Sequence, residues 1–213
     1  MAIHRAVYGL LLTTTILAFF VPFSTADPDN LQDFCNLKIS RVNGFACKPT
    51  ESVTTSDFFS KLLSTPGNTT TGVSITSANV LGFPGLNTLG VSLIRLDFAP
   101  RGIAAIHYHP RASEIIFVVE GTVNVGFVST GRKLFLQTLN KGEVFVFPQG
   151  LVHFQRNIGD TPATVLAAFN SQLQGTVLIP QTLFASTPEI PDDFLANGLR
   201  IDTEAVQNIK KKF

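Results

Sequence analysis

The sequence predicts an all-β domain, built as a sandwich or a barrel. From about residue 72 to residue 180, short runs of β-branched and aromatic residues alternate with Gly, Pro and Asn. No helical pattern interrupts these runs, and helical signals are confined to the two ends of the chain. Regularly spaced strands without helices between them are typical of β-sandwiches and β-barrels.

Six runs are the expected strands, because each is rich in β-forming residues and ends at turn residues. The run at 114–121 is apolar on both faces, with Ile115 and Phe117 on one side and Ile116 and Val118 on the other. A strand of a two-layer domain needs only one apolar face. The excess predicts a second buried surface, most simply a subunit interface. The six runs are 91–99, 114–121, 122–128, 133–139, 143–148 and 163–170.

Short helices are expected only outside this strand-rich region. Residues 55–63 follow a polar cap, residues 191–199 open with proline and two acids and close near Gly198, and residues 202–213 have Asp202 as N-cap. The lysines at 210–212 are interpreted as complementing the dipole of the last helix.

The first 26 residues are expected to be a cleaved signal peptide. A long apolar run follows the weakly basic start MAIHR, and Ser24 and Ala26 provide small residues before a cleavage site. The alternative is a membrane anchor, but the run is barely long enough and contains Pro22. The expected mature protein is one secreted, soluble domain over 27–213 without a membrane span. Its barrel is expected at about 72–180 and its C-terminal helical segment at about 190–213.

The charge balance favours neither a nucleic-acid partner nor an anionic membrane. Without residues 1–26 the chain carries 15 Lys and Arg against 15 Asp and Glu. These charges are scattered, so no basic footprint forms.

Two covalent modifications are expected in an oxidising compartment. Cys35 and Cys47 favour one disulfide that closes a short N-terminal loop and stabilises the fold by about 3 kcal/mol. Their spacing excludes a CxxC redox or zinc site. Asn68 begins the sequon NTT and is a candidate glycosylation site on an exposed loop.

Three histidines remain after the leader is removed, and they fall in two short motifs. His107 and His109 point to the same side if they lie in a strand, since side chains alternate there. Glu114 begins the following strand, and His153 comes after a Pro-x-Gly turn. A His-x-His pair alone is weak evidence, because most histidines in apolar strands are structural. Three imidazoles and a carboxylate together suit a first-row divalent metal with open positions, and Zn, Cu, Fe and Ni also accept such donors.

These motifs resemble those of plant germin-like proteins, a family of the cupin superfamily. GIAAIHYHPRASEIIFVVEG contains His-x-His-x4-Glu-x6-Gly and ends at Gly121. GEVFVFPQGLVHFQRN contains Gly-x5-Pro-x-Gly-x2-His-x3-Asn, from Gly142 to Asn157. DPDNLQDFC, NGFACKP and FPGLNTLGVS extend the resemblance over essentially the whole mature chain. One departure is Arg101, which stands at the family's leading glycine and is followed by Gly102.

The resemblance implies a single jelly-roll barrel, with manganese bound by His107, His109, Glu114 and His153. It also implies the Cys35–Cys47 disulfide and a hexamer built as a trimer of dimers. The implied location is the apoplast or cell wall.

Oxalate oxidation, the activity of germins proper, is not expected. The resemblance places Ile94 and Ala104 where two substrate-binding asparagines stand in those enzymes, and neither can donate a side-chain hydrogen bond. Burying a dicarboxylate without donors costs several kcal/mol. Superoxide is small and needs only an open metal position, and the resemblance implies a superoxide dismutase-like activity with a role in defence or stress. Gln155 is interpreted either as a donor near the ligands or as a residue of a subunit contact.

Two alternatives remain. A non-catalytic wall protein or a receptor for a small ligand, such as an aromatic hormone, fits an entrance made apolar by Ile94, Ala104 and Ile106. A nucleotide-sugar phosphodiesterase would need cations near the open positions. Arg101 and Arg111 are the only nearby candidates, and Arg111 is expected to be structural.

Overall fold

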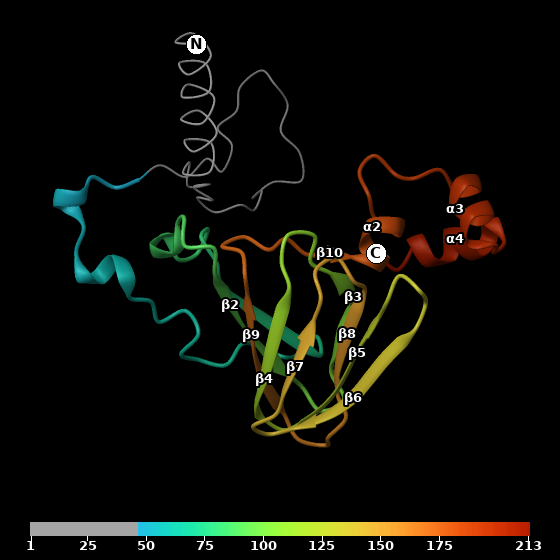
Figure 1. Ribbon diagram of the computed structural model, residues 1–213. Coiled ribbons are helices and arrows are strands. Elements are labelled where there is room, and N and C mark those ends of the chain that lie inside the picture. Colours follow the sequence, from blue (N-terminus) through green and yellow to red (C-terminus); the bar gives the residue numbers. More distant parts are fainter. Residues whose placement is uncertain (1–46) are drawn as a thin grey trace, which may run out of the picture.

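The computed structural model describes residues 47–213, and two sheets of five strands dominate it (Figure 1). The expected signal peptide, and Cys35 with its expected disulfide, lie outside the described residues. The first sheet has the order β1-β2-β9-β4-β7 and the second the order β10-β3-β8-β5-β6. Neighbouring strands pair antiparallel in both sheets. The strands are β1 (Val73–Ala78), β2 (Ser92–Phe98), β3 (Ile103–Tyr108), β4 (Glu114–Glu120), β5 (Thr122–Val128), β6 (Leu134–Asn140), β7 (Val144–Phe147), β8 (His153–Asn157), β9 (Ala163–Phe169) and β10 (Val177–Leu178).

All six expected strand runs are confirmed, as β2, β4, β5, β6, β7 and β9. The core lies between the two sheets, where each strand turns one set of side chains inward. Burying a large apolar side chain contributes roughly 1.5–3 kcal/mol, so this layer accounts for most of the fold's stability. Its fully buried members include Phe98, Ile116, Val123, Phe147 and Val165.

The apolar outer face predicted for β4 is also present. Ile116 and Val118 are fully buried, whereas Ile115 and Phe117 are 46% and 44% exposed. Their register partners on β7, Val146 and Val144, are also exposed. Four apolar side chains therefore form a patch on the outside of the first sheet.

The helix expected at 55–63 is shorter than predicted. Only a 3-10 turn forms, at Thr55–Phe58, after another at Thr50–Ser52. The backbone N–H of Thr54 donates to the Asp57 carboxylate at 2.6 Å, so the polar cap is present. No residue of the turn is buried, and a helix this short needs packing to extend.

The C-terminal region forms a separate small cluster of helices (Figure 1). The expected helices at 191–199 and 202–213 are confirmed as α3 (Asp192–Leu199) and α4 (Thr203–Lys210). They share a cluster around Leu195, Ala196 and Val206 that is distinct from the barrel core. The sequence did not predict α2 (Ile179–Phe184), which follows β10 directly and carries proline in its first turn.

Two details of this cluster add to the expectation. Gly198 lies inside α3, and Arg200 adopts the left-handed backbone conformation that ends the helix. Lys210 contacts more than the end of its own helix, because its Nζ lies 2.7 Å from Asp192 Oδ1 and 3.0 Å from Glu189 Oε2. These ion pairs tie α4 to the start of α3.

Within residues 47–213, no helix combines the length and apolar character that crossing a bilayer requires.

Candidate metal centre

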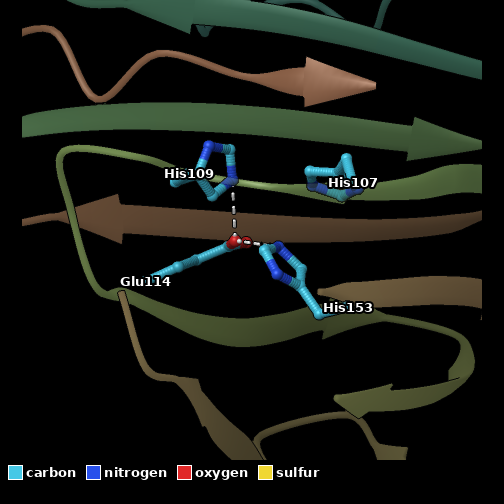
Figure 2. A group of neighbouring side chains, drawn as sticks. All are labelled: His107, His109, Glu114 and His153. Carbon is cyan, nitrogen blue, oxygen red and sulfur yellow. Dashed lines mark hydrogen bonds and ion pairs between the residues drawn. The ribbon is translucent and has the colours of Figure 1, made fainter. Parts of the chain in front are cut away.

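The two sheets contribute different donors to one point between them. His107 lies near the end of β3, His109 follows that strand directly, and His153 opens β8 beside it in the second sheet. Glu114 opens β4, which belongs to the first sheet. Figure 2 shows the four side chains converging from these elements. The four residues singled out in the sequence therefore come together.

The donor atoms are close together and shielded from solvent. One ligand atom from each residue lies within 4.8 Å of all the others, and all four residues are buried. Glu114 Oε2 is 3.1 Å from His109 Nε2 and 3.1 Å from His153 Nε2 (Figure 2). Among the described residues this is a buried site for a metal ion, formed by three imidazoles and one carboxylate.

A local irregularity in β3 turns His107 toward this point. Ala104 and His107 are both buried, although residues three apart in a regular strand face opposite sides. The pairing of β3 with β8 shifts between these two residues, so a β-bulge corrects the alternation. Ile106, which was expected at an apolar entrance, is 47% exposed.

Backbone carbonyls fix the ring orientation of all three histidines. The Nδ1 atoms of His107, His109 and His153 lie 2.6, 2.6 and 2.8 Å from the carbonyl oxygens of Ala105, Gly175 and Leu151. A carbonyl only accepts, so each Nδ1 carries the proton and donates it. A ring that carries its proton on Nδ1 presents a lone pair at Nε2, which is the atom that binds a metal.

This arrangement fits a divalent cation. Two Nε2 lone pairs and a carboxylate oxygen at 3.1 Å would repel one another unless a proton or a cation lay between them. Burial and the neighbouring His153 lower the pKa of His107 to about 4, so this ring is neutral at physiological pH. Burial would raise the pKa of Glu114, but the imidazoles of His109 and His153, whose Nε2 atoms lie 3.1 Å from its carboxylate, outweigh that effect and lower the pKa to about 2. The site therefore offers an ionised carboxylate to a cation.

Gln155 faces the interior of the barrel, not a subunit contact. Its side chain is 1% exposed. Its Nε2 donates to Glu114 Oε1 at 3.1 Å, while the other carboxylate oxygen faces the histidines. Of the two interpretations of this residue, the structure supports the donor near the ligands.

The two pocket positions predicted from the resemblance are apolar and inward-facing. Ile94 on β2 and Ala104 on β3 both belong to the buried core. Ala104 is the register partner of Gln155 across β3 and β8. No side-chain hydrogen bond can come from either position.

The two arginines considered for phosphate binding have structural contacts. Arg101 has a left-handed backbone with φ of 61° and pairs with Asp160 at 2.7 Å on the surface. Gly102 beside it allows close packing, because a Cβ there would lie 2.0 Å from the carbonyl oxygen of Gly72. Arg111 donates to the carbonyl oxygen of Leu173 at 3.0 Å. Neither contact favours a phosphate site.

Two positions expected to be modified lie at the surface. Asn68 is exposed, and its Oδ1 accepts a hydrogen bond from the backbone N–H of Thr70 at 3.0 Å. Cys47 is exposed as well.

Known proteins are similar to this chain in sequence and in fold. The family model described as Cupin matches residues 61–207. Germin-like protein subfamily 2 member 1 of Arabidopsis thaliana is 54% identical, over 96% of this chain and 95% of its own. The rhicadhesin receptor of Pisum sativum is 55% identical, over 87% of this chain and 88% of its own. A solved oxalate oxidase, in complex with the substrate analogue glycolate, superposes with a TM-score of 0.80 at 45% identity, over 88% of this chain and 98% of its own.

Fold, donor set and sequence therefore agree with the resemblance drawn from the two motifs. The chain belongs to the germin-like proteins of the cupin family.

Proposed function

We propose that this chain is a secreted manganese protein that dismutates superoxide in the plant extracellular space. The observation that carries the proposal is the buried set of three preoriented imidazoles and one carboxylate, beside inward-facing Ile94 and Ala104. Such a site can hold a metal and admit a small anion. Ile94 and Ala104 provide no side-chain hydrogen-bond donors for a larger anion such as oxalate.

Manganese is proposed because it suits this mixed donor set and because the family motifs imply it. A carboxylate and open positions favour harder, octahedral metals over the tetrahedral geometry of structural zinc. When bound, manganese would supply one-electron redox chemistry. Over one cycle, one superoxide is oxidised to dioxygen, and a second is reduced and takes up two protons to give hydrogen peroxide.

The protein's own part is to hold and shield the ion. His107, His109 and His153 present their Nε2 atoms, and the backbone carbonyls behind them prevent the rings from turning. Gln155 holds Glu114 by its other oxygen. Ile94 and Ala104 make binding of oxalate costly, because a dianion there would lose water hydrogen bonds that these side chains cannot replace.

We also propose self-association, ending in the hexamer that the family resemblance implies. The exposed patch of Ile115, Phe117, Val144 and Val146 supports an apolar contact between copies. Secretion through residues 1–26, a Cys35–Cys47 disulfide and a glycan on Asn68 belong to the same proposal. A mass shift on enzymatic deglycosylation and a thiol count under denaturing conditions test the two modifications.

The decisive experiment measures metal content, superoxide dismutation and oxalate-dependent peroxide release on the same purified oligomer. We expect about one manganese per chain, dismutation that disappears on chelation and returns with Mn²⁺, and no peroxide from oxalate. Glu114→Ala should purify as a folded protein without metal or activity. Peroxide release with oxalate would contradict the pocket argument.

A second candidate is a metal-containing binding protein without turnover. It is supported by the relative that is 55% identical and named as a receptor. A receptor needs a bound metal but no change of its oxidation state. Stoichiometric metal without dismutation would therefore favour this candidate over the enzyme.

A further inference from the structure

Of the three histidines at the metal centre, one is oriented by a distant part of the chain. The rings of His107 and His153 donate to backbone carbonyls only two residues earlier in the sequence. The ring of His109 donates instead to the carbonyl oxygen of Gly175, which is 66 residues away. A local contact forms with the strand itself, whereas a distant contact needs a second segment held in place. The orientation of His109 therefore depends on what fixes Gly175.

Arg111, on the turn between β3 and β4, holds the segment 173–175. Its backbone N–H donates to the carbonyl oxygen of Gln174 at 3.2 Å, and its Nε donates to that of Leu173 at 3.0 Å. Its guanidinium group lies against Gly175, because a Cβ placed there would be 2.6 Å from Nη2. Arg111 thus contacts all three residues of the segment.

The backbone at Gly175 is shaped for this contact. Its φ of 68° is left-handed, and a Cβ would also lie 3.0 Å from Cγ of Pro110. Only glycine adopts this conformation without strain and leaves the space that the guanidinium group occupies. The carbonyl oxygen then lies 2.6 Å from Nδ1 of His109, whereas Oγ1 of Thr176 is 3.4 Å from the same nitrogen. The carbonyl of Gly175 is therefore the main acceptor for this ring.

Other contacts fix the preceding residues of this loop without Arg111. The hydroxyl of Ser92 donates to the carbonyl oxygen of Ser171 at 2.7 Å, and the backbone N–H of Val80 donates to that of Gln172 at 3.0 Å. A substitution of Arg111 leaves these hydrogen bonds in place. It should therefore release the segment only where it faces the histidine, in a protein that still folds.

We propose that Arg111 is a positioning residue of the metal centre: it holds the carbonyl oxygen of Gly175 against the imidazole of His109, so that Nε2 stays directed at the ion. Arginine suits this role because its guanidinium presents several N–H donors in one rigid plane. The backbone carbonyl that orients a metal-ligating histidine contributes to metal affinity in the same way as a ligand's other outer partners. The inference rests on the metal site of the proposed function, but not on superoxide as the substrate.

The test uses zinc, which is diamagnetic, as the probe on the full-length oligomer with ¹⁵N-labelled histidine. In the parent protein each ring should give an Nδ1–H signal that a carbonyl protects from solvent exchange. In Arg111→Gln the His109 signal should exchange about tenfold faster, because its acceptor is no longer held. The signals of the other two rings should not change, and zinc affinity should fall about tenfold.

Arg101→Gln is the matched control. Arg101 also donates to a backbone carbonyl, that of Ile158, but it lies on the surface and pairs with Asp160. The same substitution there should alter neither the ring signals nor the zinc affinity. Gly175→Ala disturbs the contact from its other side, so it should reproduce the selective change at His109, and it replaces Arg111→Gln if that variant does not fold.

An unchanged His109 signal would overturn the inference, even if zinc bound more weakly. Equal loss of protection at all three rings would overturn it as well, because Arg111 would then only stabilise the fold. A selective change at His109 in a protein that does not dismutate superoxide would support the inference and contradict the proposed enzyme.

Discussion

At the scale of single residues, the centre depends on contacts made behind the ligands. Each histidine donates through Nδ1 to a backbone carbonyl, so its metal-binding atom is fixed before any ion arrives. The carbonyls belong to residues 105, 151 and 175. Because the rings are already oriented, binding a metal ion costs less conformational entropy.

Removing a single imidazole should abolish metal binding. We expect His107→Ala and His153→Ala to be secreted but to retain almost no metal after dialysis, since three donors remain where four are needed. Elemental analysis of the purified variants measures this. Tyr108→Phe is the matched control, because Tyr108 lies between two ligands on the other strand face, and it should keep its metal. Full occupancy in either alanine variant would refute the ligand assignment.

The donors were predictable from the sequence, but the way they meet was not. His107 and His109 stand two apart and Glu114 follows closely, so the motif itself identifies them. The bulge after Ala104 and the placement of Glu114 in the opposite sheet depend on pairing between distant strands. Local spacing does not encode that pairing. The sequence left the role of Gln155 undecided for the same reason, because its contact with Glu114 joins strands of different sheets.

At the scale of elements, strands were easier to predict than short helices. The runs at 114–121 and 122–128 are rich in β-branched and aromatic residues and end at turns, whereas 179–184 begins with apolar residues that are equally compatible with a strand. The 55–63 segment has helical residues, but it forms only a 3-10 turn and no residue of that turn is buried. Helices of one or two turns are decided by tertiary contacts, which local patterns do not show.

The outer face of β4 and β7 gives a prediction at this scale. Phe117 and Val144 are register partners and exposed, so Phe117→Lys with Val144→Lys would place two charges in the proposed contact between copies. We expect the double variant to lose self-association, because burying unpaired charges is costly. Light scattering after size exclusion gives the mass. Leu134→Lys, on the other sheet, should leave the mass of the assembly unchanged. A double variant with the same mass as the parent protein would exclude this patch from the interface.

At the scale of the whole molecule, the centre links stability to pH. The pKa of His107 is lowered from 6.5 to about 4, chiefly because burial disfavours the charged ring. The native protein therefore binds fewer protons than the unfolded chain in this range, and stability falls as pH drops from 6.5 to 4. Glu114, whose pKa is lowered from 4.5 to about 2 by its histidine partners against the effect of burial, adds a further loss between those values.

The metal-free protein should thus become less stable in mild acid. We expect a loss of up to about 3 kcal/mol between neutral pH and pH 4 from His107. Urea unfolding in the presence of a chelator measures it. His107→Ala should show a shallower decline over the same interval. A free energy of unfolding that stays constant for the parent would contradict the buried, neutral state of this ring.

The division of the donors between two sheets has a consequence for metal exchange. An ion held by His107, His109 and His153 on one side and by Glu114 on the other fastens the two layers together. Release by separation of the layers at this end would also expose the core between them. Release should therefore be as rare as partial opening of the barrel. The metal that the protein carries is then decided where the chain folds, and the supply of ions in that compartment matters more than the composition of the medium it later meets.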